Sequence, residues 1–116
     1  MGQRMKIKTS ELTGAALDWA VAKCEFPEPD YDDEWRLANT SPDGNEWAFQ
    51  PSTDWAQGGP IIEREEIAIF LEYPKSWCAT NGDVRSPGDT PLMAAMRCYV
   101  RSKLGEEINL TKEMTA

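Results

Sequence analysis

The spacing of apolar residues predicts one helix near each end of the chain. In the first helix, apolar residues recur at i, i+3, i+4 and i+7 and form a single stripe: Leu17, Ala20, Val21 and Cys24. Ser10 or Thr13, which lie about one turn apart, caps the start of this helix, and Pro27 ends it. Asp18 and Lys23 lie off the stripe.

The second helix begins at Asp89 or Thr90, with Pro91 at its first position, where a missing N–H costs nothing. Gly105 ends the helix, because glycine readily adopts the conformation that terminates one. Its buried stripe consists of Leu92, Met96, Tyr99, Val100 and Lys103 or Leu104.

Short alternating or wholly apolar runs predict strands elsewhere in the chain. The predicted strands are residues 5–9, 34–38, 45–49, 61–62, 67–73, 77–80 and 108–110. Residues 41–44 are turn residues that join the second and third of these into a hairpin, and Asn81-Gly82 marks another tight turn. Residues 67–73 are apolar on both faces, which is typical of a central strand. The glycine- and proline-containing residues 50–60 predict a loop.

Together these elements predict a single α+β domain in which two helices pack on a small, mostly antiparallel β-sheet. The length of 116 residues and the apolar content of 41% fit one soluble domain. The longest apolar run, residues 67–71, is too short to span a membrane. We expect residues 1–4 to be an N-terminal extension, residues 25–34 an acidic loop and residues 106–116 a C-terminal tail.

The net charge of −8 is concentrated in one segment. Residues 25–66 hold twelve acidic and two basic side chains, a net charge of −10, whereas the remainder carries +2. Such a segment repels a phosphate backbone, which argues against general binding to duplex nucleic acid. An acidic face suits a basic protein partner, and a small anionic ligand, which needs only a few local donors, is still compatible.

The composition also argues against common catalytic and metal sites. The chain has no histidine, which removes the commonest general base and most catalytic zinc sites. Its three cysteines, Cys24, Cys78 and Cys98, are widely spaced and form no CxxC pair, as expected of reduced thiols in a cytoplasm. We therefore predict no catalytic residues, no metal site and no cofactor.

Three blocks of sequence, residues 5–24, 51–65 and 90–105, are distinctive together. They closely resemble a family of small proteins from tailed phages and prophages, the nin-region X proteins, a family of unknown function. The resemblance implies a phage-encoded protein that is made in the cytoplasm of the infected bacterial host. It implies no particular activity and no catalytic residues.

One stretch of the middle block has the composition of a ligand-binding site. Trp55 can stack on a flat ring, paired glycines let backbone N–H groups approach a ligand, and polar side chains can hydrogen-bond it. The candidate residues are Ser52, Thr53, Asp54, Trp55, Gln57, Gly58 and Gly59. The alternative is structural: Asp54 folds a turn, Trp55 fills the core and the glycines turn the chain into the next strand.

Two further groups of charged residues invite a functional interpretation. Arg97 and Arg101 project together from the second helix, opposite its apolar stripe, and can clamp an anion; a solvated helix face is the alternative. Glu63 and Glu65 share one face of a predicted strand and, with Asp54, are candidates for metal-assisted hydrolysis; solvated edge charges are the alternative.

These observations lead to three classes of function. The first is a non-catalytic accessory protein that binds a small ligand or a host factor, in its sharpest form a homo-oligomer that sequesters a nucleotide immune signal. The second is an inhibitor that presents the acidic segment 25–66 to a basic host protein. The third, a hydrolase, has no recognised motif to support it.

Overall fold

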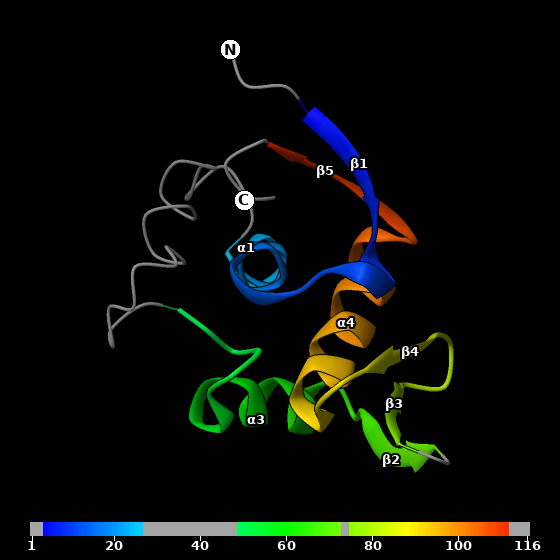
Figure 1. Cartoon of the computed structure of the whole chain (residues 1–116). Coiled ribbons are helices and arrows are strands. Elements are labelled where there is room, and N and C mark those ends of the chain that lie inside the picture. The colour runs from blue at the N-terminus through cyan, green and yellow to red at the C-terminus, as the bar shows by residue number, and fades with distance from the viewer. Residues whose placement is uncertain (1–3, 27–48, 73–74, 112–116) are drawn as a thin grey trace.

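A computed structural model describes residues 4–26, 49–72 and 75–111 of the chain. Within these ranges the protein forms three α-helices, one short 3-10 helix and two antiparallel sheets (Figure 1). The predicted α+β class is therefore confirmed. In chain order the elements are β1 (Arg4–Lys8), η1 (Thr9–Glu11), α1 (Gly14–Glu25), α3 (Trp55–Arg64), β2 (Ala68–Glu72), β3 (Ser76–Thr80), β4 (Arg85–Gly88), α4 (Pro91–Leu104) and β5 (Glu107–Thr111).

The strands form two small sheets: β2, β3 and β4 lie along the side of α4, and β1 and β5 lie near its C-terminal end (Figure 1). In one sheet β1 pairs with β5, so that Ile7 lies opposite Ile108 and the two ends of the described chain run side by side. The other sheet has the order β2-β3-β4, with Phe70 opposite Cys78 and Cys78 opposite Pro87. Helix α4 joins the two sheets into one body, because it contacts both of them.

Helix α4 is the centre of the fold. It packs against α1, α3, η1 and strands of both sheets, so that seven consecutive residues, Ala94 to Val100, are buried. A helix that is covered on all sides has no solvated face. The expectation that Arg97 lies on a solvated face is therefore wrong: its side chain is only 8% exposed.

Both predicted helices are present, with the predicted boundaries. Helix α1 follows Thr13, which is the extended residue before the first turn, and ends at Glu25, two residues before Pro27. Helix α4 follows Thr90, whose hydroxyl oxygen accepts a hydrogen bond from the backbone N–H of Met93 at 3.0 Å. It ends at Gly105, whose φ of +92° lies where glycine is favoured.

The middle of the chain departs from the prediction. Residues 55–64 form α3 instead of a loop, and the predicted strand at residues 61–62 is the last part of that helix. The predicted single sheet is divided into two, and β4 was not expected, because Pro87 interrupts its alternation. The strand within residues 67–73 is confirmed as β2, but β2 is an edge strand and not a central one.

Several expectations concern residues that the structure does not describe. The hairpin predicted around residues 41–44, nearly all of the acidic loop at residues 25–34 and most of the extension at residues 1–4 lie outside the described ranges. Of the predicted tail, residues 107–111 form β5, in agreement with the strand predicted at residues 108–110.

Candidate functional site

The polar residues after Pro51 build the start of α3. Asp54 is the N-cap: one carboxylate oxygen accepts from the N–H of Ala56 at 2.9 Å, and the other accepts from Nε2 of Gln57 at 3.1 Å. Oε1 of Gln57 in turn accepts from the N–H of Gln50 at 2.7 Å. Asp54 and Gln57 thus hold the helix and the preceding loop together. Both were expected to contact a ligand, and for Asp54 the alternative was that it folds a turn.

A buried carboxylate anchors the same loop from α1. The N–H of Ser52 donates to Oδ1 of Asp18 at 2.8 Å, and both residues are almost completely buried. Burial raises the pKa of Asp18 to about 6, although its contacts with Ser52 act in the opposite direction. Among the described residues, the buried Ser52 hydroxyl has no hydrogen-bond partner of suitable geometry. Asp18, which lies off the apolar stripe of its helix, is therefore a structural acceptor.

The two glycines lie inside α3. The N–H of Gly58 donates to the carbonyl oxygen of Asp54 at 2.9 Å, as an ordinary helical bond. A Cβ at Gly58 would lie 2.5 Å from the carbonyl oxygen of Pro51 and 2.6 Å from Cδ1 of Leu92, whereas Gly59 has open space beside its Cα. The absence of a side chain at Gly58 therefore allows α3 to approach α4 closely. The glycines do not turn the chain into a strand.

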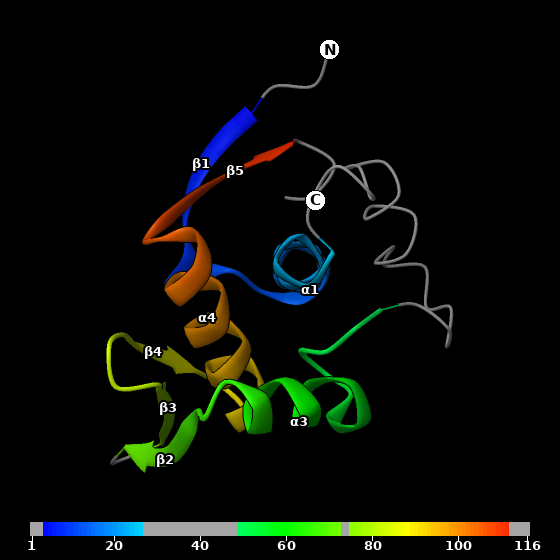
Figure 2. The ribbon, with the colours of Figure 1, turned by 180° about the vertical axis from the view of Figure 1, so that it is seen from behind.

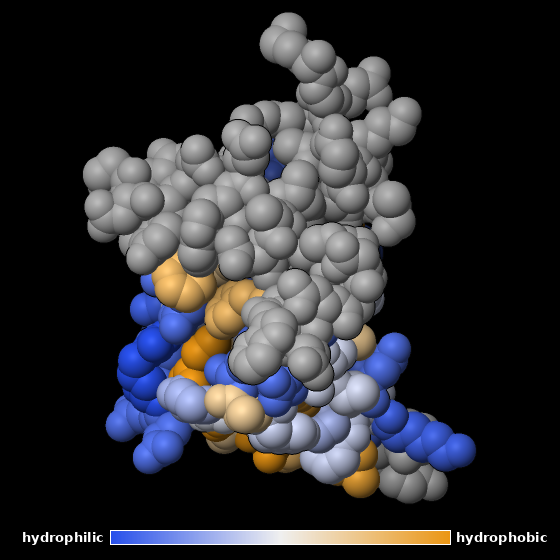
Figure 3. All heavy atoms as spheres, turned by 90° about the vertical axis from the view of Figure 1, so that its left-hand side faces the viewer, coloured by the Kyte–Doolittle hydropathy of each residue, from blue (hydrophilic) through white to orange (hydrophobic). Residues whose placement is uncertain are grey.

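Trp55 lies at a surface groove and not in the core. Its side chain is 54% exposed, while Trp19 on α1 is buried. The groove has a volume of about 240 Å³ and is lined by Ser52, Thr53, Trp55, Thr90, Pro91, Leu92 and Met93, which we call the Trp55 groove. Figure 3 views the side of the molecule on which α3 begins: apolar surface emerges along its lower edge, between strongly hydrophilic margins.

All three of the distinctive sequence blocks meet at the Trp55 groove. Its walls come from residues 51–65 and 90–105, and Asp18 of residues 5–24 holds Ser52 in place. Sequence reasoning identified one wall, Ser52, Thr53 and Trp55, but missed the other, Thr90 to Met93. Those four residues matched the start of a helix, and no local pattern indicates that this helix start lies against residues 52–55.

The structure does not bring Arg97 and Arg101 to the Trp55 groove. Nε of Arg97 donates to the carbonyl oxygen of Leu12 at 2.8 Å, and one Nη donates to that of Pro87 at 2.9 Å. Arg101 donates to the carbonyl oxygen of Arg85 and to the carboxylate of Glu106, at 2.5 and 2.9 Å. Arg101 lines a different cavity of about 320 Å³, shared with Lys8, Thr9, Ser10, Glu106 and Glu107.

The carboxylates proposed for hydrolysis are also separated. Asp54 caps the start of α3, whereas Glu63 lies nine residues later, about 14 Å along the helix axis. Glu65 caps the other end of α3, so it does not share a strand face with Glu63. The structure therefore does not assemble these three groups.

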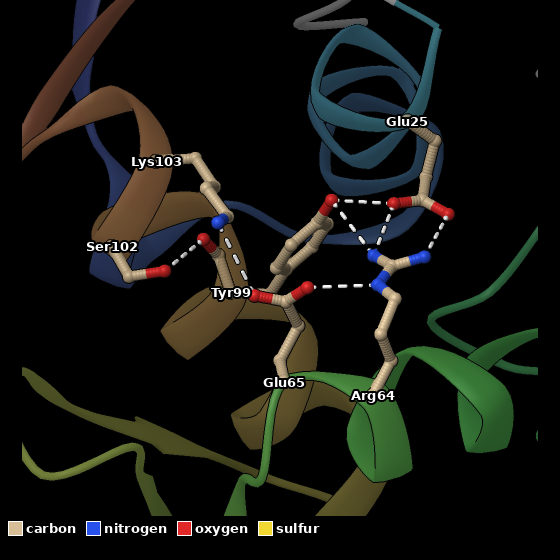
Figure 4. A network of polar contacts seen from close by, with 6 residues as sticks. All are labelled: Glu25, Arg64, Glu65, Tyr99, Ser102 and Lys103. Atoms are coloured by element: carbon tan, nitrogen blue, oxygen red, sulfur yellow. Dashed lines mark hydrogen bonds and ion pairs between the residues drawn. The ribbon is translucent and has the colours of Figure 1, made fainter.

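Glu65 instead belongs to a polar network that joins α1, α3 and α4 (Figure 4). Arg64 is its centre: the two Nη atoms bind Glu25, at 2.6 and 3.1 Å, and Nε binds Glu65 at 2.8 Å. The Tyr99 hydroxyl donates to Glu25 at 2.5 Å, and Lys103 pairs with Glu65 at 3.2 Å. We call these five residues the Arg64 network.

The electrostatics of the Arg64 network favour the charged forms of its acids. Burial acts to raise the pKa of Glu25, but hydrogen bonds from Arg64 and Tyr99 outweigh it and the pKa lies below its usual value. The hydrogen bond from Arg64 similarly lowers the pKa of Glu65. Burial, followed by the Glu25 contact, raises the pKa of Tyr99. The network is therefore a set of charge-assisted hydrogen bonds and ion pairs that fastens three helices.

We predict that Tyr99→Phe destabilises the protein by about 1.5 kcal/mol, because it removes one charge-assisted hydrogen bond and retains the buried ring. Urea unfolding of Tyr99→Phe, Glu25→Gln and the double variant measures the loss and the coupling between the two side chains. A coupling energy of zero would mean that the hydroxyl contributes nothing through Glu25.

Comparison with known families adds one finding. A family model described as "Bacteriophage P22, NinX" matches residues 8–103. This range includes the Trp55 groove and the Arg64 network completely. No curated protein matches the chain. Within the described residues, none of the helices has the length and apolar character that are needed to cross a membrane.

Proposed function

The chain belongs to the bacteriophage P22 NinX family, and from this premise we propose that it is a phage-encoded, non-catalytic accessory protein that binds a small ligand or a host factor in the Trp55 groove. The observation that carries this proposal is an exposed tryptophan at a groove where all three distinctive sequence blocks meet. The expected setting is the cytoplasm of the infected bacterial host.

The shape of the groove limits what it can hold. Its volume of about 240 Å³ is below the roughly 300–1,000 Å³ of sites that enclose a drug-sized molecule. It suits one flat ring or one apolar side chain, stacked against Trp55. A whole nucleotide would need further walls, which fits our proposal that the protein is a homo-oligomer.

The residue types that line the Trp55 groove also suit one flat ring better than a whole nucleotide. It consists of apolar side chains with the hydroxyl-bearing residues Ser52, Thr53 and Thr90, and none of the lining residues is a lysine or an arginine. A nucleotide base can therefore stack on Trp55, but the lining offers no cation for its phosphates. The most specific form of the proposal is that the protein sequesters a nucleotide immune signal. This form requires residues outside the groove to bind the phosphates of the nucleotide.

We predict that Trp55→Ala abolishes ligand capture without weakening the fold. Native mass spectrometry of protein purified from infected bacteria detects a retained compound and its stoichiometry. We expect at least a tenfold loss of bound compound in Trp55→Ala, with the free energy of unfolding changed by no more than about 0.5 kcal/mol, because the side chain is exposed.

Leu71→Ala is the matched control for this prediction. Leu71 is as exposed as Trp55, at 58%, but lies on β2, beyond the far end of α3. Capture by Leu71→Ala should equal that of the wild type. Equal capture by Trp55→Ala and the wild type would show that the groove is not the binding site.

A second proposal is an inhibitor that presents an acidic face to a basic host protein. It is favoured by the net charge of −8 and by the exposed Glu63 and Glu66 at the end of α3, although Glu25 and Glu65 are already paired with Arg64. Binding would then weaken steeply with salt and would tolerate Trp55→Ala. Amide replacement of Asp30, Asp32, Asp33 and Glu34, which lie outside the described residues, tests it.

A further inference from the structure

We infer that the free edge of β2 is a self-association surface, at which β2 pairs antiparallel with β2 of a second copy of this chain. This inference does not rest on the proposed function, because β2 and the Trp55 groove lie at opposite ends of α3. The β2 contact leaves the Trp55 groove open, so a contact between copies that supplied further walls for a nucleotide would be a different one.

The first argument is that β2 is an edge strand with little protection. Among the described strands it pairs only with β3, so the backbone groups along its other side have no strand partner. Figures 1 and 2 both show β2 at the outer margin of the molecule. Natural edge strands usually carry lysine, proline or an inward charge to block pairing. The five residues of β2 contain a single charge, Glu72, at the end of the strand.

The second argument is the apolar character of both faces of this edge. Phe70 and Leu71 are 37% and 58% exposed, and with Trp55 they are the large apolar side chains that the described part of the chain leaves exposed. Because successive side chains of a strand point to opposite faces, the two residues make both sides of the edge apolar. A ligand groove explains Trp55, whereas Leu71 is left exposed by the residues that the structure describes.

The third argument is the complementarity of β2 with itself. An antiparallel pair centred on Phe70 places Phe70 opposite Phe70 of the second copy and Ile69 opposite its Leu71. Every central pair is then apolar, and the two sheets continue as one. Such a contact is isologous and closes at two chains, as most homo-oligomeric interfaces do.

The charges around the edge allow this pairing. Arg85 of β4 reaches across the sheet, with its guanidinium 5.0 Å from the centre of the Phe70 ring and one Nη 3.3 Å from the Glu72 carboxylate. Glu72 therefore has a partner within its own chain and lies opposite Ala68 of the second copy, away from the other Glu72. No like charges face each other along the strand.

We expect the wild-type chain to have twice its monomer mass of 13.0 kDa in light scattering, with dissociation at micromolar concentrations because the strand contact is short. Leu71→Lys should raise the dissociation constant of the dimer by at least about tenfold and so favour the monomer. Its urea unfolding, measured below the dissociation constant of the wild type, should be unchanged. A wild-type chain that stays monomeric at all concentrations overturns the inference.

Cysteine cross-linking tests the register. Opposite residues of an antiparallel pair have Cβ atoms about 4.5–5.5 Å apart, and Cys78 lies opposite Phe70 within the chain, so both cysteine variants are made in a Cys78→Ala background. In that background Phe70→Cys should form a disulfide-linked dimer under mild oxidation. Glu72→Cys, on the same strand face but opposite Ala68 of the second copy, should not cross-link beyond the wild-type level. A dimer that resists Leu71→Lys and is not cross-linked by Phe70→Cys overturns this interface. Ligand capture through Trp55 is measured separately and can succeed or fail in either case.

Discussion

Gly58→Ala should destabilise the protein by about 3 kcal/mol, a large share of the stability of a small domain. The new Cβ would lie 2.5 Å from the carbonyl oxygen of Pro51 and 2.6 Å from Cδ1 of Leu92. Leu92 is only 3% exposed, and the Pro51 carbonyl is a backbone group in a loop held by Asp18. Helix α3 must therefore move away from α4, and the two walls of the Trp55 groove move apart. Urea unfolding measures the loss.

Gly59→Ala is the matched control, because it makes the same change one residue later in the same helix. Nothing lies within 4 Å of a Cβ at Gly59. Alanine favours a helix interior more than glycine does, whereas a Cβ directly before Pro60 is disfavoured in helical backbone, so the free energy of unfolding of this variant should stay within about 1 kcal/mol of that of the wild type. If the two variants were equally destabilised, the close approach of α3 to α4 at Gly58 would not be what requires glycine.

The same glycine explains why α3 could not be predicted. Gly58, Gly59 and Pro60 are three consecutive residues that disfavour helices, and local propensity indicates a loop. The helix forms because burial of Gly58 and Ile61 against α4 outweighs that preference. Asp54 was a usable signal, since an aspartate is a strong N-cap, but nothing in the local sequence shows that a helix partner is present.

The elements that carry their own start and stop signals were predicted well. Helix α4 has Thr90 and Pro91 at its beginning and Gly105 at its end, and α1 ends before Pro27. These signals do not predict how many other elements pack around a helix. Arg97 lies opposite the apolar stripe, yet it is buried because η1 and β4 cover that side of α4. The carbonyl oxygens of Leu12, directly after η1, and of Pro87 in β4 accept its hydrogen bonds.

The edge position of β2 has a similar origin. Apolar residues on both faces usually indicate two covered faces and a central strand. Here Ile69 packs against the core and the Arg85 guanidinium lies over Phe70, whereas Leu71 is exposed. The sequence pattern therefore reports a strand with two apolar faces correctly, and our inference is that a second copy supplies the missing neighbour.

The candidate site was predictable in part for a physical reason. A loop that combines an aromatic ring with polar residues can be recognised locally, and Trp55 is exposed at a groove. The roles of the polar residues around it were not recognisable, because hydrogen-bonding groups serve a helix cap and a ligand equally well. Asp54 and Gln57 make hydrogen bonds within the protein, and the long-range contact with Thr90 to Met93 turns the loop into a groove.

Asp18→Asn should make the protein more stable than the wild type at neutral pH and should leave it equally stable near pH 4. In the wild type, burial raises the pKa of Asp18 to about 6 in the folded state, against about 3.9 in the unfolded state. Between these values the folded protein binds the extra proton, so this group makes stability fall as pH rises from about 4 to about 6, and the loss is complete above that range. The two pKa values correspond to a loss of about 3 kcal/mol.

The amide removes this loss and preserves the architecture. Oδ1 of an asparagine can still accept from the N–H of Ser52, and its Nδ2 is a donor that the Ser52 hydroxyl oxygen can accept from. Urea unfolding between pH 4 and pH 8 should therefore show a stability difference between Asp18→Asn and the wild type that grows to about 3 kcal/mol and then stays constant. Glu63→Gln, which removes an exposed carboxyl group of α3, controls for general charge effects and should not reproduce the slope. A difference independent of pH would mean that Asp18 is already ionised at pH 4, and its role as the neutral anchor of the Trp55 groove in mild acid would be lost.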